Sequence, residues 1–110
     1  IKKEKYKSAI SKFKKLINKK SDNYTQADIY NYLGYTHRKL MKYDDAETYY
    51  LKALKLDSDH VGALEYIGEL YLETDRIKEA KKSLQKLKSV AGESSNEYLE
   101  LSTLIKNYSQ

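Results

Sequence analysis

The amino-acid sequence predicts an all-α protein made of repeated pairs of antiparallel helices. Three observations lead to this fold class. The 110 residues include no proline and only four glycines, so little in the chain interrupts a helix. Apolar residues recur every three or four positions, which is the spacing of one helix face. The middle of the sequence also repeats itself after 34 residues. The length is that of one domain, which we expect at residues 1–110.

The first expected helix covers residues 1–20. Its apolar face is formed by Tyr6, Ala9, Ile10, Phe13, Leu16 and Ile17. The same segment holds nine lysines against Glu4, whereas the rest of the chain holds twelve basic and fifteen acidic residues. We interpret the lysines as a solvated face, because nineteen of the 21 basic residues are lysines rather than arginines and the apolar face indicates packing on protein. The alternative is electrostatic contact of this helix with nucleic acid or an anionic membrane.

The next expected pair of helices covers residues 27–41 and 44–56, joined by a turn at Lys42–Tyr43. Asp44 is the expected N-cap of the second helix, with Glu47 completing a capping box. The turn at residues 57–59 then ends this pair, and its aspartates are expected to cap the following helix.

The second expected pair covers residues 60–73 and 77–89, joined by a turn at residues 74–76. Gly92 interrupts the chain after this pair. Ser94, with Glu97 three residues later, predicts the start of a final helix that continues to Tyr108.

A shift of 34 residues superimposes the two pairs. Tyr32-Leu33-Gly34 then coincides with Tyr66-Ile67-Gly68, and Ala46 coincides with Ala80. Glycine costs roughly 1 kcal/mol in a helix interior relative to alanine, so its presence predicts a close approach of two helices. We expect Gly34 to face Ala46, and Gly68 to face Ala80, where the two helices of each pair meet.

The repeated positions resemble those of the tetratricopeptide repeat family, of the bacterial type. They are Tyr30, Leu33, Gly34, His37, Tyr43, Ala46, Tyr50 and Ala53 in the first copy, and Leu64, Ile67, Gly68, Tyr71, Ile77, Ala80, Leu84 and Leu87 in the second. The resemblance implies repeats at 27–60 and 61–94, with 1–20 as the second helix of a truncated repeat and 95–108 as the first helix of a further repeat or a capping helix. It also implies a right-handed superhelical solenoid of about three repeats and six helices, whose concave groove binds a peptide or a protein segment.

The repeat register also predicts which residues line this groove. They are Asn31, Tyr32, Tyr35, Arg38, Lys39, Glu65, Tyr66, Glu69, Glu73 and Leu99. The tyrosines are not explained by core packing alone, although they could simply fill the space between neighbouring helices. The three glutamates recur every four residues, so they form one acidic stripe that is either an ordinary solvated face or a surface for a partner with basic residues.

The sequence offers no residues for catalysis, so we predict a protein-interaction module or scaffold, not an enzyme, with no cofactor and no metal site. Cysteine is absent. His37 falls on a core position of the repeat and His60 is expected in the first turn of a helix, so we interpret both histidines as structural. The expected partner is a protein or peptide, with self-association through the N-terminal helix as a further possibility and no specific nucleic acid. No run approaches the roughly 20 apolar residues of a membrane span, so we expect a soluble protein. The sequence leaves its compartment unknown, whether cytoplasmic or periplasmic.

Overall fold

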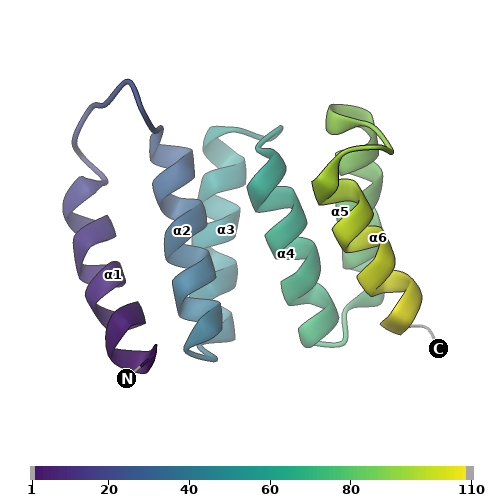
Figure 1. Ribbon diagram of the computed structural model, residues 1–110, viewed down its shortest axis with the longest axis horizontal. Coiled ribbons are helices and arrows are strands. Elements are labelled where there is room, and N and C mark those ends of the chain that lie inside the picture. The colour runs from purple at the N-terminus through teal and green to yellow at the C-terminus, as the bar shows by residue number, and fades with distance from the viewer. Residues whose placement is uncertain (1, 109–110) are drawn as a thin grey trace. The chain divides into compact units, whose positions relative to one another are not determined.

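The computed structural model describes residues 2–108, and these residues form helices and connecting turns without a strand (Figure 1). The helices are α1 (Lys2–Leu16), α2 (Gln26–Lys39), α3 (Tyr43–Leu56), α4 (Val61–Glu73), α5 (Ile77–Ala91) and α6 (Asn96–Tyr108). The all-α prediction is therefore confirmed. The chain divides into two compact units, unit 1 (Ile1–Ser58) and unit 2 (Asp59–Gln110), which are described separately below.

The helix nearest the N-terminus is shorter than expected, because α1 ends at Leu16 rather than near residue 20. The connection that follows is rich in residues that favour turns, and Gln26 Nε2 donates a hydrogen bond to the carbonyl of Ile17 across it, at 2.9 Å. A capping box starts α2. Thr25 Oγ1 accepts from the N–H of Asp28 at 3.1 Å, and the Asp28 carboxylate accepts from the N–H of Thr25 at 2.9 Å.

The expected cap of α3 was wrong. Lys42 is the N-cap residue and makes no side-chain capping bond, so Asp44 lies inside the first turn instead of before it, and Glu47 completes no capping box. Asp44 and Asp45 still stabilise this end of α3, because negative charges in the first turn complement the helix dipole.

The caps of α4 and α6 also lie one residue later than expected. His60 caps α4 in place of Asp59, since its Nδ1 accepts a hydrogen bond from the N–H of Ala63 at 3.0 Å. Ser95, rather than Ser94, accepts through Oγ from the N–H of Tyr98 at 3.2 Å. In each case the residue directly before the first helical residue makes the capping bond, because only from there does a side chain reach the N–H groups of the first turn.

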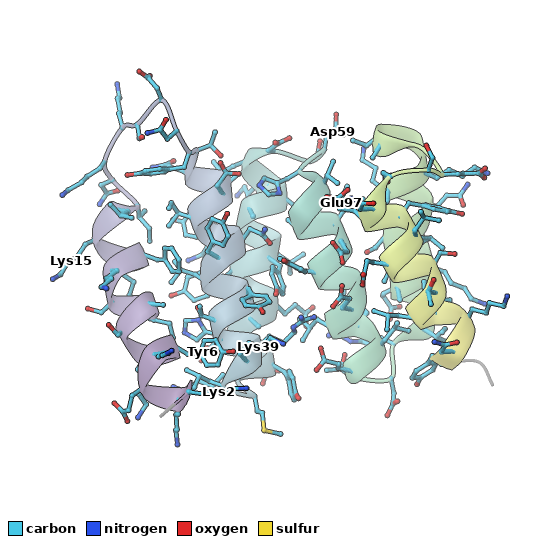
Figure 2. All side chains as sticks on the ribbon, in the orientation of Figure 1. Lys2, Tyr6, Lys15, Lys39, Asp59 and Glu97 are labelled. Atoms are coloured by element: carbon cyan, nitrogen blue, oxygen red, sulfur yellow. The ribbon has the colours of Figure 1, made fainter. Side chains whose placement is uncertain are left out.

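In unit 1, helix α2 packs against both α1 and α3 (Figure 1). The contact with α3 forms the core, with Leu33, Ala46, Tyr50 and Ala53 fully buried. The contact with α1 is looser, because no residue of α1 is buried and its apolar face is only half covered. Figure 2 shows the Lys15 side chain extending outward from α1.

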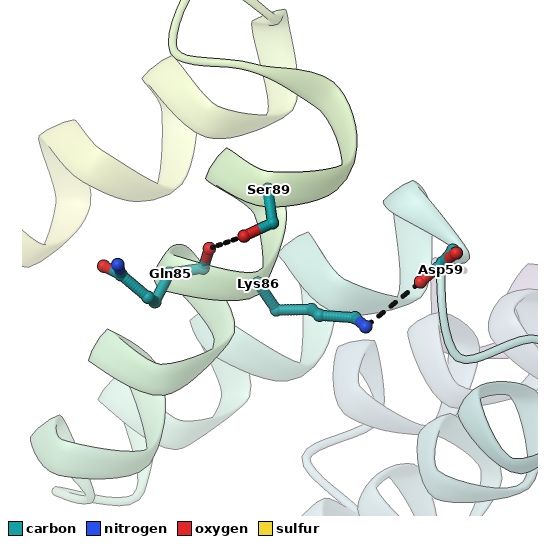
Figure 3. Close-up of polar contacts among 4 residues, drawn as sticks. All are labelled: Asp59, Gln85, Lys86 and Ser89. Atoms are coloured by element: carbon teal, nitrogen blue, oxygen red, sulfur yellow. Dashed lines mark hydrogen bonds and ion pairs between the residues drawn. The ribbon is translucent and has the colours of Figure 1, made fainter.

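In unit 2, the helices α4, α5 and α6 all pack against one another. Leu70, Leu87 and Leu101, one from each helix, are fully buried in this core. On the surface, Lys86 Nζ of α5 lies 3.1 Å from a carboxylate oxygen of Asp59, at the start of α4 (Figure 3). Ser89 Oγ donates a hydrogen bond to the carbonyl of Gln85 one turn earlier, at 3.4 Å (Figure 3).

The two repeat glycines do mark close approaches, but not to the expected alanines. A Cβ atom added to Gly34 would lie 2.5 Å from two ring carbons of Tyr50, and one added to Gly68 would lie 2.5 Å from a methyl carbon of Leu101. The larger side chains, rather than Ala46 and Ala80, are therefore the nearest atoms at these positions. Tyr50 and Leu101 have longer side chains than alanine, so they can fill the space beside a glycine even from a more distant position on the neighbouring helix.

Candidate functional site

The ten residues predicted to bind a partner fall five on each unit. Unit 1 contributes Asn31, Tyr32, Tyr35, Arg38 and Lys39, all on α2. Asn31 and Arg38 are only 5% and 7% exposed, so little of either side chain is available to a partner. The accessible part of this predicted surface therefore consists of Tyr32 and Lys39, which are exposed, and Tyr35, which is half-buried.

The two tyrosines on α2 are held in different ways. Tyr32 is 49% exposed, and its other side stacks on Phe13 of α1 with the ring centroids 5.3 Å apart. Tyr35 lies beneath two cations, with Arg38 Cζ 5.7 Å and Lys39 Nζ 5.2 Å from its ring centroid. Cation–π contacts of this kind hold the ring in place and keep positive charge at the same spot.

Unit 2 contributes Glu65, Tyr66, Glu69 and Glu73 from α4 and Leu99 from α6. Glu65 and Glu69 are half-buried, while Glu73 is exposed. The structure adds a residue that was not predicted. Carboxylate oxygens of Glu65, Glu69 and Glu100 all lie within 4.8 Å of one another, and Glu100 comes from α6.

Burial and the crowding of these carboxylates together change the protonation of Glu65. Its pKa rises from 4.5 to about 8, first because burial disfavours the charged form, and then because Glu69 hydrogen-bonds to it and adds negative charge. The charges of Glu100 and Glu97 raise the pKa further. At neutral pH the carboxyl group of Glu65 is therefore mostly protonated. The loss of its negative charge reduces the electrostatic repulsion among the three carboxyl groups.

Glu97 and Glu100 were not among the predicted partner-binding residues. The repeat register could have indicated Glu100. Glu100 stands 34 residues after Tyr66 and therefore occupies the repeat position of Tyr32 and Tyr66, both of which were selected. Around it, Asn96, Leu99, Thr103 and Leu104 line a hollow of about 450 Å³ on α6. Leu99 is 50% exposed and adds apolar area to the acidic surface.

Among the described residues, one group of carboxylates could offer oxygen ligands to a metal ion. This group consists of Glu65, Glu69 and Glu100. Ca²⁺ takes six to eight oxygen ligands, and Mg²⁺ requires near-octahedral coordination. Three carboxylates at a partly exposed helix surface fall short of either set, so the cluster does not by itself indicate a metal site.

Both histidines make structural contacts, although His60 is the N-cap residue of α4 rather than a residue of its first turn. His37 is buried, and its Nδ1 lies 2.7 Å from the carbonyl of Leu33, one turn earlier in α2. Its ring packs against Tyr49 of α3, with the centroids 4.9 Å apart. His60 uses its Nδ1 to cap α4.

Comparison with known proteins gives two matches to models of the tetratricopeptide repeat, at residues 27–60 and 63–94. Together they cover more than half of the chain. The chain belongs to the tetratricopeptide repeat family. The first repeat corresponds to α2 and α3, and the second to α4 and α5.

Two curated relatives show how far the similarity extends. The chain is 32% identical over 77 residues to the human protein O-mannosyl-transferase TMTC2, which is 70% of this chain but 9% of that protein. It is 33% identical over 83 residues to the uncharacterized protein ycf37 of Guillardia theta, covering 74% of this chain and 47% of that protein. The chain thus spans less than half the length of these relatives, and the transferase activity in the first name belongs to a much larger protein.

Membership of the tetratricopeptide repeat family makes this chain a protein-interaction module in general terms. Within residues 2–108, no helix is both long enough and apolar enough to cross a membrane.

Proposed function

We propose that this tetratricopeptide repeat chain is a non-enzymatic module and that unit 2 binds a basic segment of a protein partner. The binding surface is the acidic surface formed by Glu65, Glu69, Glu97 and Glu100 of α4 and α6. The observation that carries the proposal is the gathering of three carboxylates within 4.8 Å, together with the pKa of Glu65 near 8. Every influence on that pKa raises it, so a lysine or arginine brought by a partner would supply the opposite charge.

Apolar contact would accompany this charge pairing. Leu99 and Leu104 are exposed on α6, next to Glu100 in the same hollow, and Tyr66 is half-buried on α4. Tyrosine and leucine side chains at the edge of a charged surface exclude water around an ion pair and thereby strengthen it. A peptide in which basic and apolar residues alternate fits this arrangement.

Tyr32, Tyr35 and Lys39 on α2 form the part of the proposal that belongs to unit 1. They combine aromatic area with positive charge on unit 1. Tyrosine gives a large contact area with few rotatable bonds, so ordering it on binding costs little entropy.

Charge reversal tests the acidic surface directly. We expect Glu65→Lys with Glu69→Lys to weaken binding of a fluorescent Lys- and Leu-containing peptide at least about tenfold, since attraction becomes repulsion. The matched control is Glu79→Lys with Glu93→Lys, which makes the same charge change elsewhere in unit 2. The control should retain affinity within about threefold, because neither carboxylate belongs to the cluster of Glu65, Glu69 and Glu100. Equal losses in both variants would contradict a localised surface.

The protonation of Glu65 gives an independent readout. Binding of a cationic peptide favours the charged carboxylate, so affinity should increase as pH rises from 6 to 9 and a proton should be released on binding. Titration calorimetry in buffers with different ionisation enthalpies measures that release. Glu65→Gln should abolish it, and an unchanged proton release in this variant would exclude Glu65 as its source.

Self-association through α1 is a separate part of the proposal. None of its residues is buried, and the apolar stripe that includes Ile10 and Leu16 is only half covered. A second copy could cover the remaining area. Light scattering at increasing protein concentration should then show dimers that Ile10→Glu dissociates, whereas a monomer at all concentrations would eliminate this contact.

A further inference from the structure

A hollow on unit 1 combines positive charge with exposed apolar atoms. It has a volume of about 450 Å³ and lies where the first turns of α1 approach the end of α2. Its lining consists of Lys2, Lys3, Tyr6, Lys39, Leu40 and Met41, and we call it the lysine hollow. Figure 2 shows Lys2, Tyr6 and Lys39 gathered at this end of unit 1, while Lys15 points away from it.

The apolar part of the lysine hollow contains an unusual methionine. Met41 is 71% exposed and has a φ of +62°, a left-handed conformation that side chains rarely adopt outside glycine, asparagine and aspartate. Tyr6 and Leu40 beside it are half-buried. Methionine is flexible and polarizable, so an exposed one packs readily against apolar side chains of different shapes.

The charged part consists of three lysines, and no carboxylate lines the hollow among the described residues. Glu4, the one acidic residue of the first twenty, is exposed and outside the lining. Two carbonyls near the end of α2 already accept backbone hydrogen bonds, which makes them less available to the lysines. The N–H of Met41 donates to Arg38 O at 2.8 Å, and that of Lys42 donates to His37 O at 2.9 Å.

We propose that the lysine hollow binds an acidic segment of a partner protein, in which one apolar side chain lies between aspartates or glutamates. The apolar side chain would pack on Tyr6, Leu40 and Met41, and the flanking carboxylates would pair with Lys2, Lys3 and Lys39. This site is distinct from the acidic surface of unit 2, because it lies on another unit and selects a partner of opposite charge.

A protein segment fits this hollow better than nucleic acid does. Phosphate recognition favours the bidentate guanidinium of arginine, whereas the cations here are all lysines. A sugar–phosphate backbone also leaves the exposed Met41 side chain without an apolar partner, while a leucine or isoleucine between carboxylates covers it.

The test uses the full 110-residue chain and two short fluorescein-labelled peptides of Asp, Glu, Gly and Ser, one with a central leucine and one with serine in its place. Binding is measured by fluorescence anisotropy at an ionic strength of about 0.15 M, where screening acts beyond roughly 8 Å. We expect the leucine peptide to bind and the serine peptide to bind about tenfold more weakly, since one apolar contact is lost.

Two double variants with the same change in net charge distinguish binding at the lysine hollow from attraction by the overall positive charge of α1. Lys2→Glu with Lys39→Glu should weaken binding of the leucine peptide about tenfold, because two ion pairs become repulsive. Lys12→Glu with Lys15→Glu, on exposed positions of α1 outside the hollow, should weaken it by no more than about threefold. Circular dichroism confirms that each variant remains helical.

Met41→Gly tests the apolar half and relieves the left-handed strain at the same time, so the fold is not at risk. This variant should bind the leucine peptide about tenfold more weakly and leave the affinity for the serine peptide unchanged. The proposal is overturned if the leucine peptide does not bind, or if both double variants lose affinity equally. It is also overturned if duplex DNA or phosphatidylserine vesicles show the same dependence on Lys2, Lys39 and Met41.

Discussion

Gly34 in unit 1 and Gly68 in unit 2 occupy the same repeat position, yet a different side chain fills the space beside each. The ring of Tyr50 from α3 lies against Gly34, whereas Leu101 from α6 lies against Gly68. The counterpart of Tyr50 in the second repeat is Leu84, which is smaller and only partly buried. The repeat thus maintains a close approach at this position, and the neighbouring sequence decides which helix supplies the contact.

The same pair of units uses one lysine position in two ways. Lys52 Nζ lies 5.6 Å and 5.5 Å from the ring centroids of Tyr30 and Tyr49, which stack on each other between α2 and α3. Its counterpart Lys86 pairs with Asp59 instead, because serine and leucine replace the two aromatic residues in unit 2. An exposed repeat position therefore takes its contacts from its surroundings.

The surface charge of the two units differs more than their framework does. Unit 1 contains fourteen basic and seven acidic residues, and unit 2 contains seven basic and nine acidic residues. The lysine hollow contributes to the excess of positive charge on unit 1, and the acidic surface contributes to the excess of negative charge on unit 2. A repeat framework leaves such surfaces to vary, because the positions that hold the helices together are the buried apolar ones.

The largest expected effect comes from filling the space beside the repeat glycines. Gly34→Ala should lower the free energy of unfolding by about 2 kcal/mol, since overpacking against a fully buried ring outweighs the roughly 1 kcal/mol gained in helix propensity. Gly68→Ala should cost about 1 kcal/mol or less, because the methyl groups of Leu101 can rotate away. Chemical denaturation measures both values. Equal costs would show that the two glycines have equivalent neighbours after all.

The next largest effect is a pH dependence of the free energy of unfolding that arises from Glu65 in unit 2. Glu65 has a folded pKa of about 8 against an ordinary value of 4.5, so its contribution to stability is complete below pH 4.5 and is lost as pH rises through 8. Glu65→Gln should remove this slope and raise the free energy of unfolding above pH 8 by about 1 kcal/mol, a value reduced by solvent screening. Thermal melts across this range measure the slope. Glu73→Gln, an exposed control on α4, should leave it in place.

A smaller effect distinguishes the turns that end α2 and α4. Met41 and Asp75 stand 34 residues apart and both have positive φ, at +62° and +60°. Met41→Gly should stabilise the chain by about 0.5–1 kcal/mol, because glycine adopts this conformation without strain. Asp75→Gly should bring little or no gain, since aspartate tolerates the conformation and accepts a 2.6 Å hydrogen bond from the Tyr108 hydroxyl. A matched gain at both positions in denaturation experiments would argue against this distinction.

The smallest effects are expected at the two equivalent lysines. Asp59→Asn, which breaks the exposed pair with Lys86, should cost less than about 0.5 kcal/mol and less still in high salt. Lys52→Met should cost about 0.5 kcal/mol, because its cation–π contacts are lost while its packing is kept. Denaturation at two salt concentrations compares them. A larger cost for Asp59→Asn would reverse the ranking of the two contacts.

The sequence by itself determined the helices, the 34-residue repeat and the family of this protein. Each of these depends on local spacing. Apolar residues at helical intervals define a buried face, and the paired glycines and alanines place the two repeats in register. Positions such as Leu33 and Ile67 could therefore be assigned to the core without a structure, and both are buried.

Only the tertiary structure decided what lies beside what. Glu100 joins Glu65 and Glu69 because α6 packs on α4, and the lysine hollow forms because residues 2–6 of α1 approach residues 39–41 at the end of α2. The caps depend on the structure as well, since only the backbone geometry at the start of α4 shows that His60, not Asp59, reaches the N–H of Ala63. Contacts between segments far apart in the chain depend on the packing of whole helices, and the spacing of residues within one helix does not record that packing.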